Sequence, residues 1–347
     1  MIPYWLLFGY FLFGAVLSNG SAGGRQPASL PILFGALVIA LMVGLRFDVG
    51  ADWASYEFLF QFAGRADLWR VLEIGDPGYQ FLNWLVKQAG AGFWLVNLVC
   101  ATIFAWGLQR FARAQADPWL ALVVAIPYLV TVVAMGYTRQ SVAIGIILAG
   151  LASLQRGSSI PRFALYVAMA ALFHRTAVVV LPLVVFAADR NRFMNLLGGV
   201  AASIVLYDAF LSDSVDLFVQ NYIEAEYSSQ GAGIRVAMNL LPAAIFLLAG
   251  HRFQYPARDH NIWRNFSLAA CVLLVLLLVL PSSTAVDRLS LYIIPLQMAV
   301  LARMPRALDS PILRVTIMLY SAAVLFVWLG FATHAQYWLP YRFYPLV

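Results

Sequence analysis

The stretch LALVVAIPYLVTVVAMGYTRQSVAIGIILAGLASL, residues 120–154, decides the fold class of this chain. Two apolar runs, each near the length that crosses a bilayer, flank a short turn that contains Arg139. An arginine at membrane depth costs several kcal/mol unless it is paired or faces a watery cavity. The stretch therefore predicts two membrane helices joined at a membrane face, with a candidate binding site at the turn.

The composition of the whole chain extends this interpretation. The 347 residues are 63% hydrophobic and 11% charged, whereas soluble domains carry about 25% charged residues. We expect an all-α polytopic integral membrane protein whose residues 1–347 form a single transmembrane domain. Twelve apolar segments lie at 3–17, 30–45, 92–109, 118–135, 140–155, 161–172, 176–188, 193–211, 235–250, 265–281, 287–302 and 312–331.

Several of these segments are shorter than the roughly 20 residues that span a bilayer. We expect those near 140–188 to be tilted, broken or re-entrant. Two connecting loops are long, at 46–91 and 212–234. The first contains WASYEFLFQF and YQFLNWLVKQ, whose apolar residues recur at helical spacing, so we expect amphipathic helices on the external surface.

The distribution of charge predicts the orientation. If the segments alternate, one set of loops holds 13 basic and four acidic residues, and the other holds nine basic and 12 acidic residues. The first set is predicted to be cytoplasmic and both termini external. The arginines on this disfavoured external side include Arg46, Arg139, Arg175 and Arg288. Such a cluster predicts a site for an anionic group such as a phosphate.

Several function classes are not supported. Cys100 and Cys271 both lie in apolar runs, without disulfide or metal-ligand spacing. Nucleotide-binding loops and the H-E-x-x-H zinc motif are absent, so we expect no cofactor and no metal. The basic residues are spread over short loops, which is typical of a topology signal and not of nucleic-acid binding.

The first candidate motif is RFDVGADWASYEF, residues 46–58. Asp48, Asp52 and Tyr56 recur every four positions and would share one face of a helix. The two carboxylates could orient Arg46, act as a base or bind a divalent metal, or they could simply cap the helix and pair with Arg46; two acids without a histidine disfavour the metal site.

The second motif is GYTRQSVAIG, in which Thr138 is predicted to cap a helix with Arg139 and Gln140 in its first turn. A helix N-terminus favours anions, so an arginine there calls for an anion nearby.

Two further turns complete the candidate site. FHRTAVVVLPL places His174, a potential proton acceptor, beside Arg175, which would lower the pKa of the imidazole. STAVDRLSLY places Asp287 and Arg288 at the start of a segment, either as a neutralised pair or with Arg288 held toward a cavity by Asp287.

Together these stretches resemble the EpsG family of bacterial exopolysaccharide proteins, within the wider Wzy-like polymerase group. The matching features run in order from about residue 42 to 341: LRFDVGADWASYEF, DPGYQFLNWLV, YTRQSVAIGIILAGLASL, ALFHRTAVVVLPLVVF, DRLSLYIIPLQ and YWLPY. Residues 193–282 do not match, and we expect that region to carry substrate specificity.

The resemblance implies an enzyme of the bacterial cytoplasmic (inner) membrane that polymerises undecaprenyl-pyrophosphate-linked repeat units at the external face. The reaction would be a metal-independent inverting glycosyl transfer in exopolysaccharide, O-antigen or capsule biosynthesis. Membrane lipid, the lipid-linked glycans, a chain-length regulator and a flippase are the implied partners. The family pattern emphasises the first motif, Arg139, Gln140, His174 and Arg288.

We assign roles on this basis. His174 or Asp52 would take the proton from the acceptor hydroxyl. Arg46, Arg139, Arg175 and Arg288 would hold the pyrophosphate, supported by Asp48, Tyr56, Gln140 and Asp287. Two alternatives stay open: a transferase that adds one sugar from a polyprenyl-phosphate donor with Asp48 or Asp52 as base, and a flippase or exporter of lipid-linked glycan. A flippase needs its cations reachable from both faces, which disfavours it here.

Overall fold

The computed structural model describes residues 1–18, 30–187, 197, 201, 204–205, 231–280 and 283–346. Every regular element in these ranges is a helix, and the paired extended residues there are Arg46 and Phe343, which form an isolated antiparallel bridge. The prediction of an all-α fold is therefore confirmed for these ranges. The predicted segment 193–211 lies almost wholly outside the described residues, as does most of the predicted loop 212–234.

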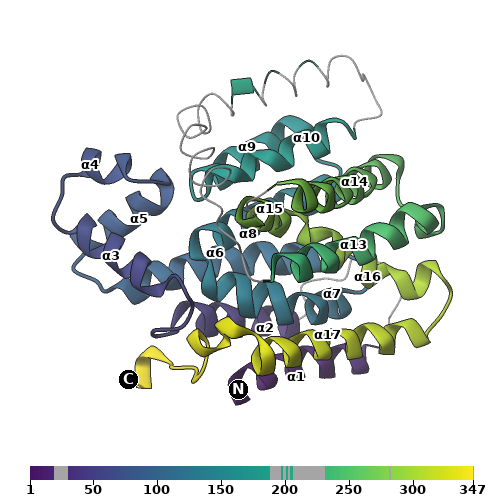
Figure 1. Cartoon of the computed structure of the whole chain (residues 1–347), viewed down its shortest axis with the longest axis horizontal. Coiled ribbons are helices and arrows are strands. Elements are labelled where there is room, and N and C mark those ends of the chain that lie inside the picture. The colour runs from purple at the N-terminus through teal and green to yellow at the C-terminus, as the bar shows by residue number, and fades with distance from the viewer. Residues whose placement is uncertain are drawn as a thin grey trace.

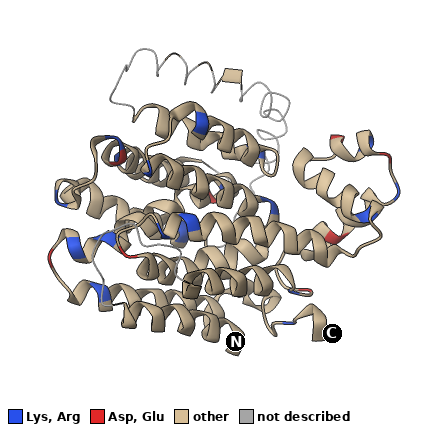
Figure 2. Cartoon of the chain, turned by 180° about the vertical axis from the view of Figure 1, so that it is seen from behind, with Lys and Arg blue, Asp and Glu red and all other residues tan. Residues whose placement is uncertain are grey.

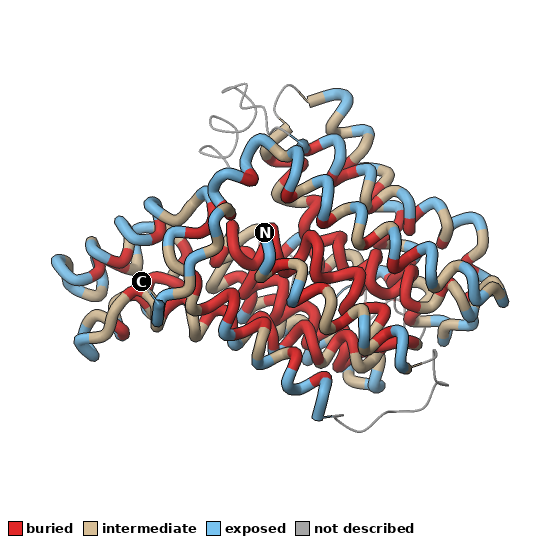
Figure 3. The backbone as a smooth tube through the Cα atoms, turned by 90° about the horizontal axis from the view of Figure 1, so that it is seen from below, coloured by how far each residue is buried: buried red, intermediate tan, exposed pale blue. Residues whose placement is uncertain are grey.

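The centre of the bundle is built around α8 (Thr138–Gln155) and α6 (Phe93–Ala112). Every residue of α8 from Gln140 to Leu154 is buried, as expected for a helix that is apolar on all sides. The two helices approach closely because Gly107 and Gly145 meet, and a Cβ on Gly107 would collide with the Gly145 carbonyl. Figure 3 shows the buried residues concentrated in the middle of the molecule.

The remaining helices surround this pair (Figure 1). The helix α7 (Pro118–Ala125) continues as the π-helical η1 (Ile126–Ala134), which packs against α8, and α16 (Ile294–Ala307) packs against α7. One flank holds α1 (Ile2–Leu17), α2 (Leu30–Gly44) and α17 (Ile312–Phe331). The other flank holds α9 (Ile160–Ala171), η2 (Arg175–Val179), α10 (Val180–Val185), α13 (Ala232–Ala249), η5 (Gly250–Phe253), α14 (Ala257–Val279), α15 (Ser283–Ser290) and η6 (Leu291–Ile293).

The apolar helices differ in length. Among the described residues, five helical stretches are long and apolar enough to cross a membrane: Phe93–Ala112, Ala232–Phe253, Ala257–Val279, Ser283–Ala307 and Ile312–Phe331. Five shorter apolar stretches accompany them: Ile2–Leu17, Leu30–Gly44, Pro118–Ala134, Ile160–Ala171 and Arg175–Val185. The chain is thus suited to a membrane-embedded state, but twelve spans are not confirmed. The stretch Arg175–Val185 is broken into a 3-10 turn and a short α-helix.

The loop 46–91 forms a small lobe of three helices at one end of the bundle: α3 (Trp53–Ala63), α4 (Leu68–Glu73) and α5 (Pro77–Gln88). Figure 1 shows the C-terminus on the side of the lobe and the N-terminus near the middle of the lower edge. In α3 the buried residues Tyr56, Phe60 and Ala63 follow a helical stripe, and Phe58 is exposed. Helices are therefore present in the loop 46–91, as predicted.

One detail of the first motif was predicted wrongly. The helix α3 begins at Trp53, and Asp48 has a left-handed backbone with φ 48°. Asp52 occupies the N-cap position, and Tyr56 is one turn later. Asp48 therefore does not share a helical face with Asp52 and Tyr56.

Figure 2 shows several basic residues of the described part of the chain at the end of the bundle opposite the lobe. Hydrogen bonds join neighbouring connections at this end: Arg258 donates to the Ser158 carbonyl, and Arg314 to the Asp117 carboxylate. The described part of the chain thus has one arginine-rich end and a second end that carries the lobe.

Candidate functional site

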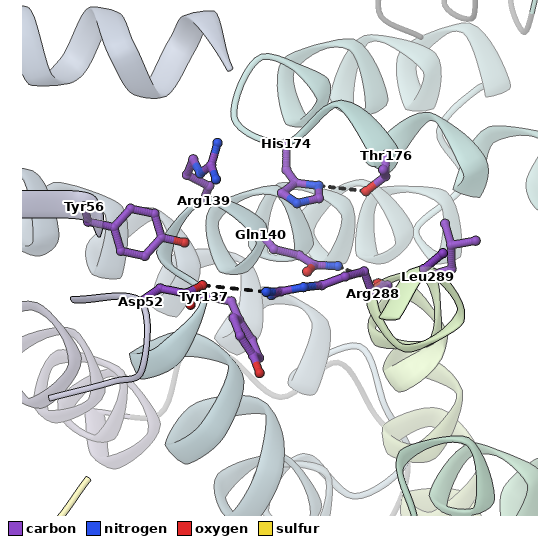
Figure 4. Close-up of a pocket in the computed structure, with 10 residues that line it drawn as sticks. Asp52, Tyr56, Tyr137, Arg139, Gln140, His174, Thr176, Arg288 and Leu289 are labelled. Atoms are coloured by element: carbon purple, nitrogen blue, oxygen red, sulfur yellow. Dashed lines mark hydrogen bonds and ion pairs between the residues drawn. The ribbon is translucent and has the colours of Figure 1, made fainter. Parts of the chain in front are cut away.

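A cavity of about 140 Å³ lies where the lobe meets the bundle. Figure 4 shows its walls, which come from the start of α3, the start of α8, the turn between α9 and η2, and α15. Its lining residues are Asp52, Tyr56, Tyr137, Arg139, Gln140, His174, Thr176, Ala285, Arg288 and Leu289. Six residues nominated from four separate stretches of sequence therefore line one cavity.

Arg139 lies in the first turn of α8 and has the counterion that this position calls for. Its Nη1 is 2.8 Å from Oδ2 of Asp76, at the N-cap position of α5. Asp76 is only 6% exposed, and its Oδ1 accepts a hydrogen bond from the Arg175 backbone N–H at 3.1 Å. Burial raises the pKa of the Asp76 carboxyl, and the Arg139 guanidinium opposes that shift. One buried carboxylate thus joins the lobe, α8 and the α9–η2 turn.

Arg288 enters the cavity from α15. Its guanidinium lies 4.0 Å above the ring of Tyr137, and its Nη2 is 3.7 Å from Oδ2 of Asp52. The Arg288 carbonyl accepts a hydrogen bond from Nε2 of Gln140 at 2.7 Å, which ties α15 to α8. The loose contact with Asp52 leaves the guanidinium able to bind another anion.

Asp287 pairs with Arg235, whereas both predicted arrangements paired it with Arg288; Arg288 does line the cavity, as the second arrangement predicted. Asp287 is 3% exposed and forms an ion pair with Arg235 of α13. Consecutive residues of a helix point in different directions, so Asp287 faces the bundle while Arg288 faces the cavity. The pair Arg235–Asp287 anchors the helix that carries Arg288.

His174 lies in the turn between α9 and η2, outside both helices. Its Nδ1 is 2.7 Å from the Thr176 hydroxyl and 3.1 Å from the Tyr292 hydroxyl. In Figure 4 the second ring nitrogen points away from Thr176, toward the side of the cavity where Gln140 lies. Burial, followed by the charges of Arg139 and Arg288, lowers the pKa of His174 to about 3. The imidazole is therefore neutral. The sequence suggested that Arg175 lowers its pKa, but the charges responsible are those of Arg139 and Arg288.

Arg46 and Arg175 do not line the cavity. Arg46 is 1% exposed and donates to the carbonyls of Val43 and Val49 and to the Thr138 hydroxyl. The prediction that Thr138 caps α8 is wrong. Thr138 is the first residue of α8, and Tyr137 occupies the N-cap position. The Arg175 side chain donates to the Gly75 carbonyl at 2.8 Å, beside Asp76.

Asp48 lies apart from these groups. It forms an ion pair with Arg342 at 3.1 Å, and both side chains are about half exposed. No group of three His, Cys, Asp or Glu residues suited to a metal ion occurs among the described residues. The positive charge that the cavity does contain comes from Arg139 and Arg288.

Four residues of the site were missed by the sequence reasoning: Asp76, Tyr137, Thr176 and Tyr292. Asp76 had a usable signal, because Asp followed by Pro and Gly in DPGYQFLNWLV is a typical helix start. Tyr137 and Thr176 are sequence neighbours of nominated residues. Tyr292 reaches His174 only through tertiary packing, 118 positions along the chain.

Comparisons with known proteins identify the family. Neither the curated proteins nor the solved structures contain a significant match to this chain. The model of the EpsG family matches residues 29–343, which is nearly the whole chain, and its region of match includes all the residues that line the cavity. The protein therefore belongs to the EpsG family, a family of Wzy-like polymerases.

Proposed function

We propose that this protein polymerises lipid-linked oligosaccharide repeat units by inverting glycosyl transfer, with the cavity facing the exterior of the bacterial cytoplasmic (inner) membrane. Family membership points to a polysaccharide polymerase role. The observation that carries the finer proposal is the convergence of Arg139, Arg288 and a neutral His174 on one cavity at the end of an apolar bundle. Undecaprenyl pyrophosphate is the proposed lipid carrier.

The proposed reaction breaks the bond between the anomeric carbon of the growing chain and the pyrophosphate oxygen, and the bonding electron pair leaves with that oxygen. An acceptor hydroxyl attacks the anomeric carbon from the opposite face, which inverts its configuration. Arg139 and Arg288 hold the pyrophosphate and stabilise the charge that develops on it. Removing one such donor typically costs about 10²–10³-fold in rate.

The geometry changes the proposed roles of the other two arginines. The donors of Arg46 are bonded to Val43, Val49 and Thr138, and the side chain of Arg175 is bonded to Gly75. We therefore propose that both act as positioning residues. Arg46 would orient the start of α8, and Arg175 would orient the carboxylate that holds Arg139.

Two groups remain candidates for the base that takes the hydroxyl proton. With the cavity empty, a pKa of about 3 makes His174 a weak base. A bound pyrophosphate would offset the charges of Arg139 and Arg288 and would therefore raise the pKa of His174. The same anion would compete with Asp52 for Arg288 and release that carboxylate. Substrate binding would thus activate either candidate.

The test is the size distribution of surface polysaccharide on a resolving gel after deletion of the gene and complementation with variants. We expect His174→Gln and Arg139→Gln to leave a single lipid-linked repeat unit in place of a ladder, because loss of a base typically costs about 10²–10⁴-fold in rate. His334→Gln, an exposed histidine in the C-terminal tail, is the matched control and should restore the ladder.

Other gel patterns would contradict the proposal. Wild-type ladders from His174→Gln and Arg139→Gln at normal expression would remove these residues from the mechanism. Loss of all external glycan on deletion would indicate a flippase or an early transferase. A full ladder that lacks one side-branch sugar would indicate the transferase that adds a single sugar.

A further inference from the structure

An apolar groove adjoins the charged cavity. Leu289 lines both spaces, and it directly follows the cavity residue Arg288. Val179 and Ile293 also line the groove; Val179 lies three positions after Thr176, and Ile293 directly follows Tyr292, the partner of His174. The apolar surface therefore begins where the cationic surface ends.

The groove runs along one face of α14. Its lining residues there follow helical spacing: Asn265, Leu268, Ala269, Val272 and Leu273. The opposite wall is formed by Leu183 of α10 and by Phe186 at the C-terminal end of that helix. The volume of the groove is about 410 Å³. From Asn265 to Leu273 the groove extends about 12 Å, at a rise of about 1.5 Å per residue.

Asn265 is the polar residue among those that line the groove. The Asn265 side-chain amide donates to the Leu183 carbonyl at 2.9 Å, which joins α14 to α10. The rest of the lining consists of aliphatic side chains and Phe186. The groove is therefore suited to a single narrow apolar chain that starts at the cationic cavity.

We propose that this groove binds the isoprene units nearest the phosphate of a polyprenyl pyrophosphate while Arg139 and Arg288 hold the pyrophosphate. The proposal rests on the proposed function, and it names the subsite that would recognise the lipid carrier. An anion that is covalently joined to one apolar chain needs a cationic and an apolar surface in direct continuity, and Leu289 provides that continuity. Each methylene-sized group of the isoprene chain that is buried in the groove should increase the affinity for the lipid about fourfold.

Size alone does not identify such a subsite. A second apolar pocket, between α1, α2 and α7, is larger, at about 640 Å³. Its lining includes Tyr10, Phe34 and Trp119 but no charged side chain. It lacks a place for the pyrophosphate and is not proposed to bind the carrier.

The experiment compares the binding of inorganic pyrophosphate and geranyl pyrophosphate to the purified full-length protein in one detergent by titration calorimetry. Val272→Trp fills the groove, and Val275→Trp is the matched control. Both valines are on α14, and they are 55% and 58% exposed, but Val275 does not line the groove. Leu268→Trp repeats the test one turn deeper, so that a folding defect in one variant does not decide the outcome.

We expect the wild type and Val275→Trp to bind geranyl pyrophosphate at least about tenfold more tightly than inorganic pyrophosphate. In Val272→Trp and Leu268→Trp this preference should fall to about twofold or less, with unchanged binding of inorganic pyrophosphate. A preference that persists in both groove variants would overturn the proposed subsite and leave the proposed function intact.

Two further results would also overturn the subsite. Equal competition by a diacyl phosphatidic acid would indicate a general site for lipid acyl chains. Absence of binding by either pyrophosphate would remove the cationic site as well and would count against the proposed function.

Discussion

The neutrality of His174 makes the stability of the protein depend on pH in a definite direction. Burial and the charges of Arg139 and Arg288 lower the pKa of this imidazole from 6.5 to about 3 in the folded protein. Between these two values the unfolded chain binds a proton that the folded protein excludes. The contribution of His174 is therefore fully present above pH 6.5, and it is lost as the pH falls from 6.5 toward about 3.

The size of the effect follows from the two pKa values. Lowering the pH from about 7.5 to about 5 with this shift removes at most about 2 kcal/mol of unfolding free energy. The ring is partly accessible from the cavity, so we expect about 1–2 kcal/mol after this solvent contact is taken into account. His174→Gln removes the titrating group, and this part of the pH dependence should disappear with it.

Equilibrium unfolding in mixed micelles at the two pH values measures the difference directly. The wild type should lose about 1–2 kcal/mol more than His174→Gln on acidification. His334→Gln, the exposed control in the tail, should behave as the wild type does. Equal losses in the wild type and in His174→Gln would refute the argument, because the histidine would then titrate alike in the folded and unfolded protein.

Three other substitutions test separate parts of the structure. Arg288→Lys keeps the charge but loses the planar group above Tyr137, and we expect polymerisation to fall about tenfold in a gel assay; wild-type activity would show that charge alone suffices. Arg46→Ala leaves the carbonyls of Val43 and Val49 without donors and should lower the unfolding free energy by about 2–6 kcal/mol, at about 1–3 kcal/mol for each unsatisfied group; equilibrium unfolding in mixed micelles measures this loss, and an unchanged unfolding free energy would show that these bonds do not stabilise the fold. Gly107→Ala should abolish accumulation of the folded protein, because its Cβ would collide with the Gly145 carbonyl; normal yield on size-exclusion chromatography would contradict the close helix contact.

The local sequence was sufficient for the helices and for most of the cavity. Apolar runs identified α8, which is buried on all sides and must therefore be apolar on all sides, and α6, which is an apolar run of membrane-spanning length. Charged or titratable residues in short turns between such runs are costly there, so Arg139, His174 and Arg288 were identifiable as a candidate site without coordinates. Their convergence agrees with that reasoning, because all three line the cavity.

The sequence did not predict correctly which charged side chains pair with one another. Sequence proximity suggested that Asp287 neutralises Arg288 and that Arg175 lowers the pKa of His174. In the structure Asp287 pairs with Arg235, and the charges that act on His174 come from Arg139 and Arg288. Adjacent residues on a helix diverge by about 100°, whereas packing brings together groups that are far apart in the chain.

The sequence by itself thus determined the apolar helical architecture, the amphipathic lobe and the turns in which the functional groups lie, since each depends on local periodicity and on the cost of burying charge. Tertiary structure alone decided which arginines reach the cavity. Arg46 is the first residue of the loop that forms the lobe, yet its donors are bonded to backbone carbonyls and to Thr138. Arg139 is held at the cavity by Asp76, which comes from the lobe. Hydrogen-bond partners of a buried guanidinium are set by which segments pack around it, and that information is distributed over the whole chain.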